Sequence, residues 1–510
     1  LARQETVRIL LKLVIWTFAL FGLLFILLLM CLVGLLRTDI GTVGPLPKKM
    51  ILQIDFDTAP AEIKPDDLTA AFYGGGASFF ELMQVLAMAG TDERVEAVVG
   101  KIGVSDLSLA QVQELRGQIK YLRTKGKKTY LFSEGFGSFG GGTAEYYLAS
   151  AFDEIVLQPS GEVGITGIGI EMPFVKGLLN KIGIEPEFYA RYEYKNAFVP
   201  FTDTDMSPLL RKEFGRLGGD LFDQIVGDIA KDRKIEPQRL RKLIDEAPLD
   251  AKQATEEKLV DRLDYQERFM QDLEEKYNAK RTDWQNYLTG LEPVGQGSPV
   301  VAMVIIEGEI AEGDSSLPSW EGEPVTSADS FVAQLTEVAA LENLKAVVLR
   351  INSPGGSYAA ADEMRQALKD FKQKTKVPVV VSMSSYAASG GYFVALPADK
   401  ILAQPATLTA SIGVVGGKPV LSGLWNKLGV RWNGVYFGNN AGILSLNKSF
   451  TSEERKIFEK SLDNIYRDFT SKVADARHIK PEELDKLARG RVFSGRQAAK
   501  NGLIDGIGGY

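Results

Sequence analysis

The residues best suited to nucleophilic chemistry are serines in a run of small residues. Ser389 lies in the segment 384–392, Ser-Ser-Tyr-Ala-Ala-Ser-Gly-Gly-Tyr, which follows a predicted strand and opens an apolar helix. Small neighbours would leave its hydroxyl open to a substrate carbonyl, and such a serine can form a covalent acyl intermediate. Ser384 and Ser385 are alternative nucleophiles. A Ser/Gly-rich helix cap is the other interpretation of this segment.

A pair of glycines marks a second candidate segment. The run 352–356, Asn-Ser-Pro-Gly-Gly, directly follows a strand predicted at 346–351. Paired glycines let the backbone turn with its N–H groups unobstructed. Such groups could bind the oxyanion of a tetrahedral intermediate. Taken alone, the segment favours an ordinary turn before a helix.

A nucleophilic serine needs a base, and histidine is poorly placed to supply it. The chain's single histidine, His478, lies between charged residues at a predicted helix end, which is typical of a solvated side chain. The remaining option is a lysine whose pKa is lowered by burial, so that the amine is neutral. Lys195 lies among aromatic and apolar neighbours in the segment 192–201, Tyr-Glu-Tyr-Lys-Asn-Ala-Phe-Val-Pro-Phe. Lys400 and Lys418, near the serine segment in sequence, are the alternatives.

The elements that must position these side chains alternate between strand and helix. The pattern predicts strands and helices in turn at 300–306, 327–341, 346–351, 359–371 and 377–382, and two late helices at 452–476 and 481–487. This order indicates an α/β fold with a parallel sheet flanked by helices. Sites in such sheets gather at the carboxyl ends of strands, where both candidate segments fall.

Most of the chain consists of two repeats of one sequence unit. Similar blocks recur at offsets of 249, 246 and 244 residues, a drift that loop insertions would cause. We therefore predict an N-terminal segment at 1–46, a first repeat at 47–297 that includes a linker, and a second repeat at 298–510.

The two repeats differ at the candidate site. The first repeat has Thr143 at the position of Ser389, and its counterpart of the Pro-Gly-Gly turn is 104–107, Val-Ser-Asp-Leu. The second repeat has Asn440 or Ala441 at the position of Lys195. The first half therefore has the candidate lysine without the serine, and the second half has the serine without the lysine. This suggests one composite site, with the base from the first half and the nucleophile from the second.

The N-terminal segment contains a predicted membrane anchor. Lys12 and Arg37 bracket the 24 uncharged residues 13–36. As a helix rising ~1.5 Å per residue, this run is roughly 36 Å long, which is enough to cross a bilayer. It exceeds the roughly 7–15 apolar residues of a cleavable signal peptide, so we expect a permanent single-pass anchor.

Composition excludes several classes of function. The net charge of −7 shows no basic excess of the kind that binds nucleic acid. A single cysteine excludes an internal disulfide. One cysteine and one histidine argue against a zinc site, so we expect neither a metal nor a cofactor.

Five segments together resemble the S49 serine peptidase family in its long, duplicated form. They are Tyr194-Lys195 and the runs 352–357, 387–392, 407–413 and 473–478. The resemblance covers almost the whole chain, and it implies two tandem ClpP/crotonase-like domains behind the membrane helix. It also implies roles for individual residues. These are Ser389 as nucleophile, Lys195 as general base, Ser411 as the residue that orients the lysine, and Gly355, Gly356 and Gly390 as the oxyanion hole.

The same resemblance implies a cellular role. The resemblance implies a bowl-shaped homotetramer in the bacterial inner membrane, with the catalytic part facing the periplasm. Family members degrade signal-peptide remnants and other apolar peptides. Two alternatives stay open at this point, a crotonase-like enzyme acting on acyl thioesters and a catalytically inert membrane scaffold.

Overall fold

The structure is a computed structural model that describes residues 16, 20–27, 45–64, 76–137, 141–291, 297–313 and 324–510. Most of the anchor predicted at 13–36 lies outside these residues. Within the part that is described, none of the helices is both long and apolar enough to cross a membrane.

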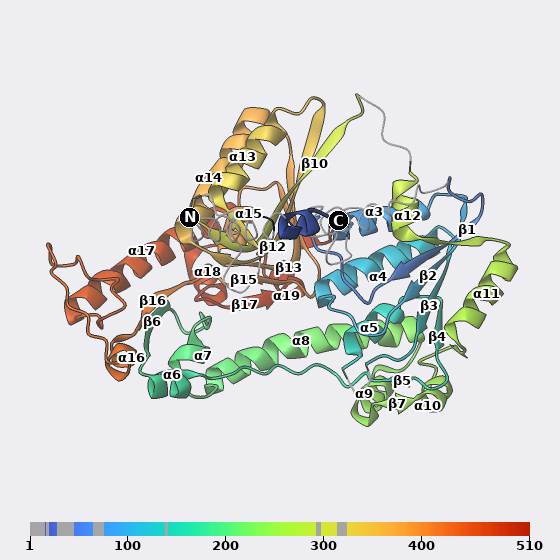
Figure 1. The fold of residues 1–510 in the computed structure, drawn as a ribbon, viewed down its shortest axis with the longest axis horizontal. Helices are drawn as coiled ribbons and strands as arrows, with labels where there is room; N and C mark the ends of the chain where they lie inside the picture. Colours follow the sequence, from blue (N-terminus) through green and yellow to red (C-terminus); the bar gives the residue numbers. More distant parts are fainter. Residues whose placement is uncertain are drawn as a thin grey trace, which may run out of the picture.

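The first half folds around a six-stranded parallel sheet (Figure 1). Its strand order is β8-β4-β3-β2-β1-β9. The strands are β1 (Met50–Asp55), β2 (Val95–Lys101), β3 (Lys128–Ser133), β4 (Glu154–Leu157), β8 (Arg262–Leu263) and β9 (Lys280–Asp283). The central strands are almost wholly buried, because helices cover a parallel sheet on both faces. The main covering helices are α3 (Phe79–Ala89), α4 (Leu109–Thr124), α5 (Thr143–Ala149) and α11 (Gln266–Tyr277).

The second half repeats this arrangement in the order β11-β10-β12-β13-β14-β18. Its strands are β10 (Val300–Ala311), β11 (Val325–Ser327), β12 (Leu344–Gly356), β13 (Val379–Ala388), β14 (Lys400–Ala403) and β18 (Gly506–Ile507). Two short strands, β15 (Leu408–Ala410) and β17 (Val492–Ser494), pair at its edge. The helices are α13 (Ala328–Ala339), α14 (Tyr358–Thr375) and α15 (Gly390–Ala395). The predicted α/β fold with parallel sheets is confirmed.

The duplication extends to individual hydrogen bonds. The buried Tyr146 hydroxyl donates to the carbonyl of Leu259 at 2.7 Å, and the buried Tyr392 hydroxyl donates to the carbonyl of Leu503 at 2.7 Å. Each bond ties the helix after β3 or β13 to the loop before an edge strand of the same sheet, β8 or β18. The two halves are therefore copies in structure as well as in sequence.

One small sheet joins the halves. Strand β6 (Glu185–Arg191) of the first half pairs antiparallel with β16 (Val414–Val420) of the second. Lys195 follows β6 by four residues, and Ser411 precedes β16 by three. The long helix α8 (Pro208–Arg233) also reaches the second half, where Arg216 donates to the carbonyl of Val492 at 2.6 Å. The pairing of β6 with β16 thus brings Lys195 of the first half next to Ser411 of the second half.

Three strands of the second half run further than the sequence predicts. The strand predicted at 300–306 is β10, which ends at Ala311. The strand predicted at 346–351 continues as β12 to Gly356, which lies opposite Ile310 of β10. Glycine permits this, because Gly356 has a φ of 154° and a Cβ there would lie 2.1 Å from the Ile310 carbonyl oxygen. The strand predicted at 377–382 is β13, which ends at Ala388. The segment before Ser389 is therefore strand and not a helix cap.

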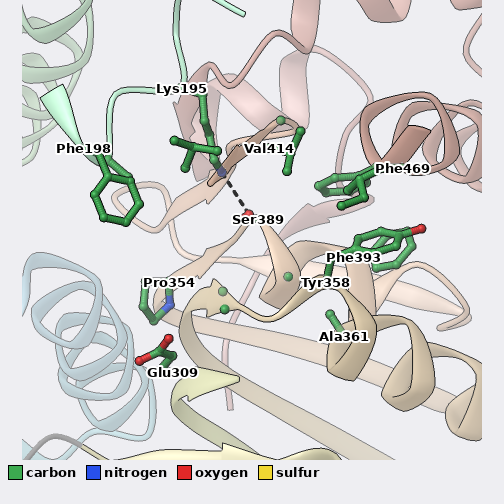
Figure 2. Close-up of a pocket in the computed structure, with 17 residues that line it drawn as sticks. Lys195, Phe198, Glu309, Pro354, Tyr358, Ala361, Ser389, Phe393, Val414 and Phe469 are labelled. Atoms are coloured by element: carbon green, nitrogen blue, oxygen red, sulfur yellow. Dashed lines mark hydrogen bonds between the residues drawn. The ribbon is translucent and has the colours of Figure 1, made fainter. Parts of the chain in front are cut away.

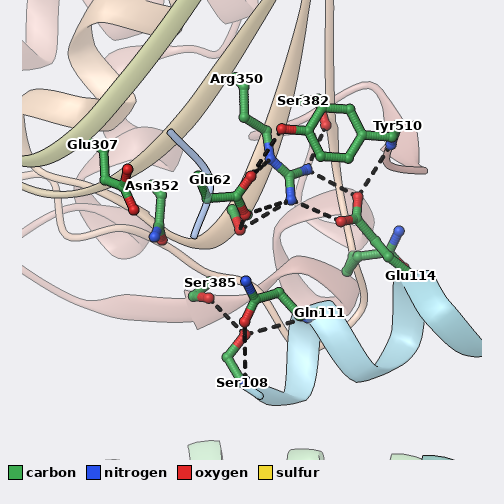
Figure 3. Close-up of polar contacts among 12 residues, drawn as sticks. Glu62, Ser108, Gln111, Glu114, Glu307, Arg350, Asn352, Ser382, Ser385 and Tyr510 are labelled. Carbon is green, nitrogen blue, oxygen red and sulfur yellow. Dashed lines mark hydrogen bonds and ion pairs between the residues drawn. The ribbon is translucent and has the colours of Figure 1, made fainter. Parts of the chain in front are cut away.

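A buried charged cluster also ties the halves together (Figure 3). Arg350, fully buried on β12, donates to Glu62 at 2.9 and 3.1 Å and to Glu114 at 2.7 and 2.9 Å. The Tyr510 ring lies 4.0 Å from the guanidinium carbon. Burial alone would raise the pKa of Glu62, but the charge and hydrogen bonds of Arg350 lower it below its ordinary value. The cluster therefore pairs Glu62 and Glu114 of the first half with the buried cation of Arg350 in the second half.

We expect Arg350→Leu to lower the free energy of unfolding by about 3–5 kcal/mol, because two buried carboxylates lose their cation. Loss of the exposed Arg241–Asp223 ion pair in Arg241→Leu should cost below about 1 kcal/mol. Because the folded pKa of Glu62 is lowered, its stabilisation is present above its unfolded pKa of about 4.3 and is lost as the pH falls through the folded value. Urea unfolding at neutral and acid pH measures both effects. Equal losses in the two variants would contradict the prediction.

Candidate active site

Ser389 occupies a sharp turn between β13 and α15. Its φ of 53° and ψ of −116° lie in a region that non-glycine residues rarely adopt. Backbone bonds hold this conformation, since the Ser389 N–H donates to the Ala410 carbonyl at 2.7 Å and the Ser389 carbonyl accepts from Phe393 N–H at 3.0 Å. The turn presents the hydroxyl to a cavity at the carboxyl edge of the sheet (Figure 2).

The amine of Lys195 lies against this hydroxyl. The Lys195 Nζ donates to Ser389 Oγ at 2.9 Å, and to the Oγ and carbonyl oxygen of Ser411 at 3.0 Å each. The lysine side chain is almost fully buried, and this burial lowers its pKa to about 7. An amine with this pKa is largely neutral in mildly alkaline solution, and its lone pair can then accept the serine proton.

The second half holds the lysine loop in place through its backbone. The N–H of Tyr194 donates to the Arg489 carbonyl at 3.1 Å. Gly490 has a φ of 88°, and a Cβ there would lie 2.4 Å from the Lys195 nitrogen, so glycine is needed for this close approach. Ser411, with a φ of 52°, donates its N–H to the Arg491 carbonyl at 3.0 Å. The loops of both halves thus fix the amine beside the hydroxyl.

Two backbone N–H groups converge next to Ser389. Gly390 is the first residue of α15, so its N–H has no acceptor within the helix. A Cβ on Gly390 would lie 3.4 Å from the nitrogen of Gly356, so the backbone of Gly356 passes close to Gly390. The N–H of Gly355, the third predicted donor, is instead hydrogen-bonded to Ser353 Oγ at 3.1 Å. Gly356 and Gly390 are therefore the pair available to an oxyanion.

The cavity beside Ser389 has a volume of about 420 Å³ and largely apolar walls. Its walls include Tyr358, Phe393 and Val414 (Figure 2). They also include Ile465 and Phe469. The last two lie on α17 (Ser452–Arg477), a helix that the sequence predicts without showing which of its faces meets the site. An apolar side chain of a peptide would fit this cavity better than a charged one.

Comparison with known proteins decides the family. The profile of Peptidase family S49 matches residues 123–280 and 371–510, more than half of the chain. The chain belongs to peptidase family S49. The S49 relatives include Protease 4 of Salmonella typhi, 30% identical over 85% of this chain and 70% of that protein, and Protease 4 of Haemophilus influenzae, 29% identical over 85% and 71%. Serine protease SPPA, chloroplastic, of Arabidopsis thaliana is 28% identical over 87% of this chain and 66% of that one.

These matches show that the protein is a serine protease of the long, duplicated S49 form. The Clp protease profile matches residues 322–409, which contain the central strands of the second sheet. Among solved structures, a ClpP1 point mutant from Listeria monocytogenes is 20% identical, covers 41% of this chain and 91% of that chain, and has a TM-score of 0.27.

The alternative bases in this S49 protease are engaged or exposed elsewhere. Lys418 donates to the carbonyl oxygens of Ile443 and Ser445 at 2.8 Å each. Lys400 is exposed at the start of β14, and His478 is an exposed C-cap of α17 in a left-handed conformation. Of the bases considered from sequence, Lys195 is the one that contacts the Ser389 hydroxyl.

The alternative serines are also bound elsewhere. The buried Ser384 hydroxyl donates to Glu62 in the charged cluster, and Ser385 Oγ donates to Ser108 Oγ at 2.6 Å (Figure 3). In the first half, the Thr143 hydroxyl donates to the Gly167 carbonyl at 2.8 Å and accepts from its N–H at 3.0 Å. None of these three hydroxyls is paired with a lysine amine as Ser389 is.

We expect Ser411→Ala to lower kcat roughly 10–100-fold without removing activity. The Lys195 amine keeps its contact with Ser389 Oγ but loses the hydrogen bond to Ser411 Oγ that orients it. Steady-state kinetics on one peptide measure this loss. Ser411→Cys keeps a weakly hydrogen-bonding side chain without placing a β-branched residue at a φ of 52°, and it should retain more of the rate than Ser411→Ala. Equal losses in both variants would show that the hydroxyl has no orienting role.

Proposed function

We propose that this S49 serine protease cleaves apolar peptides with a Ser389–Lys195 dyad. The observation that carries the proposal is the 2.9 Å contact between the Lys195 amine and the Ser389 hydroxyl, in a site whose burial lowers the lysine pKa to about 7. The two groups come from different repeats, as the lopsided sequence pattern predicts.

The mechanism follows from these contacts. Ser389 Oγ attacks the scissile carbonyl carbon while its proton passes to the neutral Lys195 Nζ. The N–H groups of Gly356 and Gly390 stabilise the resulting oxyanion. The Lys195 ammonium then gives its proton to the leaving amine as the C–N bond breaks. Lys195 then takes a proton from a water molecule as the water oxygen attacks the acyl ester, and returns it to Ser389 Oγ as the ester C–O bond breaks.

The proposed substrates are signal-peptide remnants and other apolar peptides. The apolar cavity beside Ser389 supports this, as does similarity to a protein described as a putative signal peptide peptidase SppA from Enterococcus faecium, 33% identical over 42% of this chain and 61% of that one. We further propose that residues 13–36 anchor the chain by a single pass in a bacterial inner membrane. The catalytic part would face the periplasm as a homotetramer, close to apolar peptides left in the same bilayer.

Cleavage of a synthetic signal peptide in phospholipid vesicles tests this function. The full chain in the same vesicles should cleave it with a kcat/KM at least about tenfold above that for a polar peptide of equal length, because each well-buried apolar side chain favours binding. Equal cleavage of both peptides would contradict the substrate assignment. Hydration of an enoyl thioester without peptide cleavage would indicate the crotonase-like alternative.

A further inference from the structure

Two segments of the described chain that lie outside helices and strands have no backbone partner. Residues 168–174 in the first half and 431–437 in the second form no backbone hydrogen bond with any other described residue. Both expose apolar side chains, and Phe437 and Val435 are 90% and 83% exposed. The other exposed apolar residues are Ile168, Ile170, Trp432 and Tyr436. An apolar segment whose backbone groups are unpaired can accept another strand.

The repeat shows which strand each segment would accept. At an offset of 246 residues, 168–174 corresponds to β16 and 431–437 corresponds to β6. Matching residues fix this alignment, with Gly167 and Pro173 aligned to Gly413 and Pro419, and Gly183 aligned to Gly429. Because β6 and β16 pair antiparallel within the chain, the two unpaired segments are the counterparts of an existing pair.

Packing beneath the segments supports the correspondence. In the second half β16 lies on α17, and a Cβ on Gly416 would lie 3.2 Å from the Phe458 ring and 3.5 Å from Leu462. In the first half a Cβ on Gly218 of α8 would lie 3.1 Å from Ile170 Cδ1. In the second half the glycine lies on the strand and the large side chains lie on the helix, whereas in the first half Ile170 lies on the segment 168–174 and the glycine lies on the helix. Residues 168–174 therefore lie on α8 as β16 lies on α17, with a free edge where β16 has β6.

We propose that residues 431–437 of one copy pair antiparallel with residues 168–174 of a second copy. The register of β6 on β16 places Phe437 opposite the partner subunit's Ile168, Val435 opposite the partner subunit's Ile170, and Trp432 opposite the partner subunit's Pro173. A lipid bilayer is the other conceivable occupant of these aromatic side chains. Hydrocarbon would leave the backbone groups of 431–437 without hydrogen bonds, whereas a strand satisfies them.

This contact joins the second half of one copy to the first half of the next. It is head-to-tail, so it repeats from copy to copy and forms a ring when the rotation closes. The contact would be the interface between copies in the homotetramer proposed above. The inference therefore rests on the proposed self-assembly, and it does not depend on the Ser389–Lys195 dyad. Each junction between copies would bring Asn440 and Ala441 toward the partner subunit's Thr143, where no lysine is supplied. The ring would then contain one dyad in each chain.

Disulfide trapping tests the pairing in the full chain in detergent, with Cys31→Ala to remove the native thiol and Ser389→Ala to separate assembly from catalysis. Gly169→Cys combined with Tyr436→Cys places thiols directly opposite each other, and a Cβ at Gly169 meets no atom within 4 Å. Under a copper(II) oxidant we expect linked species of two, three and more copies. Their yield should exceed that of a control pair, Gly169→Cys with Leu444→Cys, by about tenfold, because disulfides need closely opposed Cβ atoms.

A second variant keeps the test decisive if the thiols oxidise poorly. Val435→Asp with Phe437→Asp changes two exposed side chains and should convert the assembly to monomers in sedimentation velocity. Dimers linked through Tyr436→Cys alone would contradict the head-to-tail pairing. So would an aspartate variant that keeps its assembly, or one that loses only its binding to phosphatidylglycerol vesicles, since that result assigns 431–437 to the membrane.

Discussion

Ser389→Ala should lower kcat for peptide hydrolysis by about 10⁵- to 10⁶-fold, because a serine nucleophile cannot be replaced by the remaining binding and oxyanion groups. The fold should be unaffected, since the backbone of Ser389 and not its hydroxyl makes the bonds that hold the turn. Steady-state hydrolysis of a fluorogenic apolar peptide measures the loss, and circular dichroism checks the fold.

The matched control is Ser385→Ala, four residues away on β13. Ser385 is hydrogen-bonded to Ser108 and not to the lysine, so this variant should stay within about threefold of wild type, a difference of under 1 kcal/mol in the barrier. A folded Ser389→Ala enzyme with more than about one hundredth of wild-type activity would exclude Ser389 as the nucleophile.

Lys195→Met should be the second large effect, with kcat lowered about 10⁴-fold or more, because the variant keeps a long apolar side chain in a buried site but has no base. In the wild type, kcat/KM should rise with pH through about 7 as the amine loses its proton, and then level off. The control Lys418→Met should keep this pH profile, since Lys418 donates to two backbone carbonyls away from Ser389. A pH profile unchanged in Lys195→Met would contradict the assignment of the base.

The same lysine makes stability depend on pH. Its folded pKa of about 7 lies below its unfolded value of about 10.4, so between these values the unfolded chain binds more protons than the folded chain. Stability therefore rises with pH across this window, by at most ~1.4 kcal/mol per pH unit for this group. Lys195→Met should flatten the slope measured by urea unfolding from pH 7 to 10. An identical slope in both proteins would show that the lysine is not buried in solution.

The site residues could be predicted because each carries a local signal. Ser389 lies among small residues after a strand, Lys195 lies among aromatic residues, and the mismatch between the repeats assigns one to each half. The structure adds what makes them meet, which is the β6–β16 pair. Neither local pattern shows that β6 and β16, which are far apart in sequence, pair with each other. The duplication indicates only that some contact between the halves exists.

Other features depend on partners that no local pattern can reveal. Arg350 lies in an apolar strand run, and its partners Glu62 and Glu114 are 288 and 236 residues away in sequence. The predicted ends of β10, β12 and β13 were wrong, and for β12 the reason is again a contact with residues distant in sequence. Glycine after a strand usually favours a turn, but here Gly355 and Gly356 pass close to α15 and β10 while still in the strand.

Covalent labelling of the full chain with a fluorophosphonate, followed by mass spectrometry of the labelled peptide and by its rate against pH, tests the composite dyad most directly. Label on Ser389, at a rate that rises through pH about 7 in the wild type and is lost in Lys195→Met, is the predicted result. Label on another serine, or labelling of Ser389 at the wild-type rate in Lys195→Met, would contradict a nucleophile and base drawn from the two repeats.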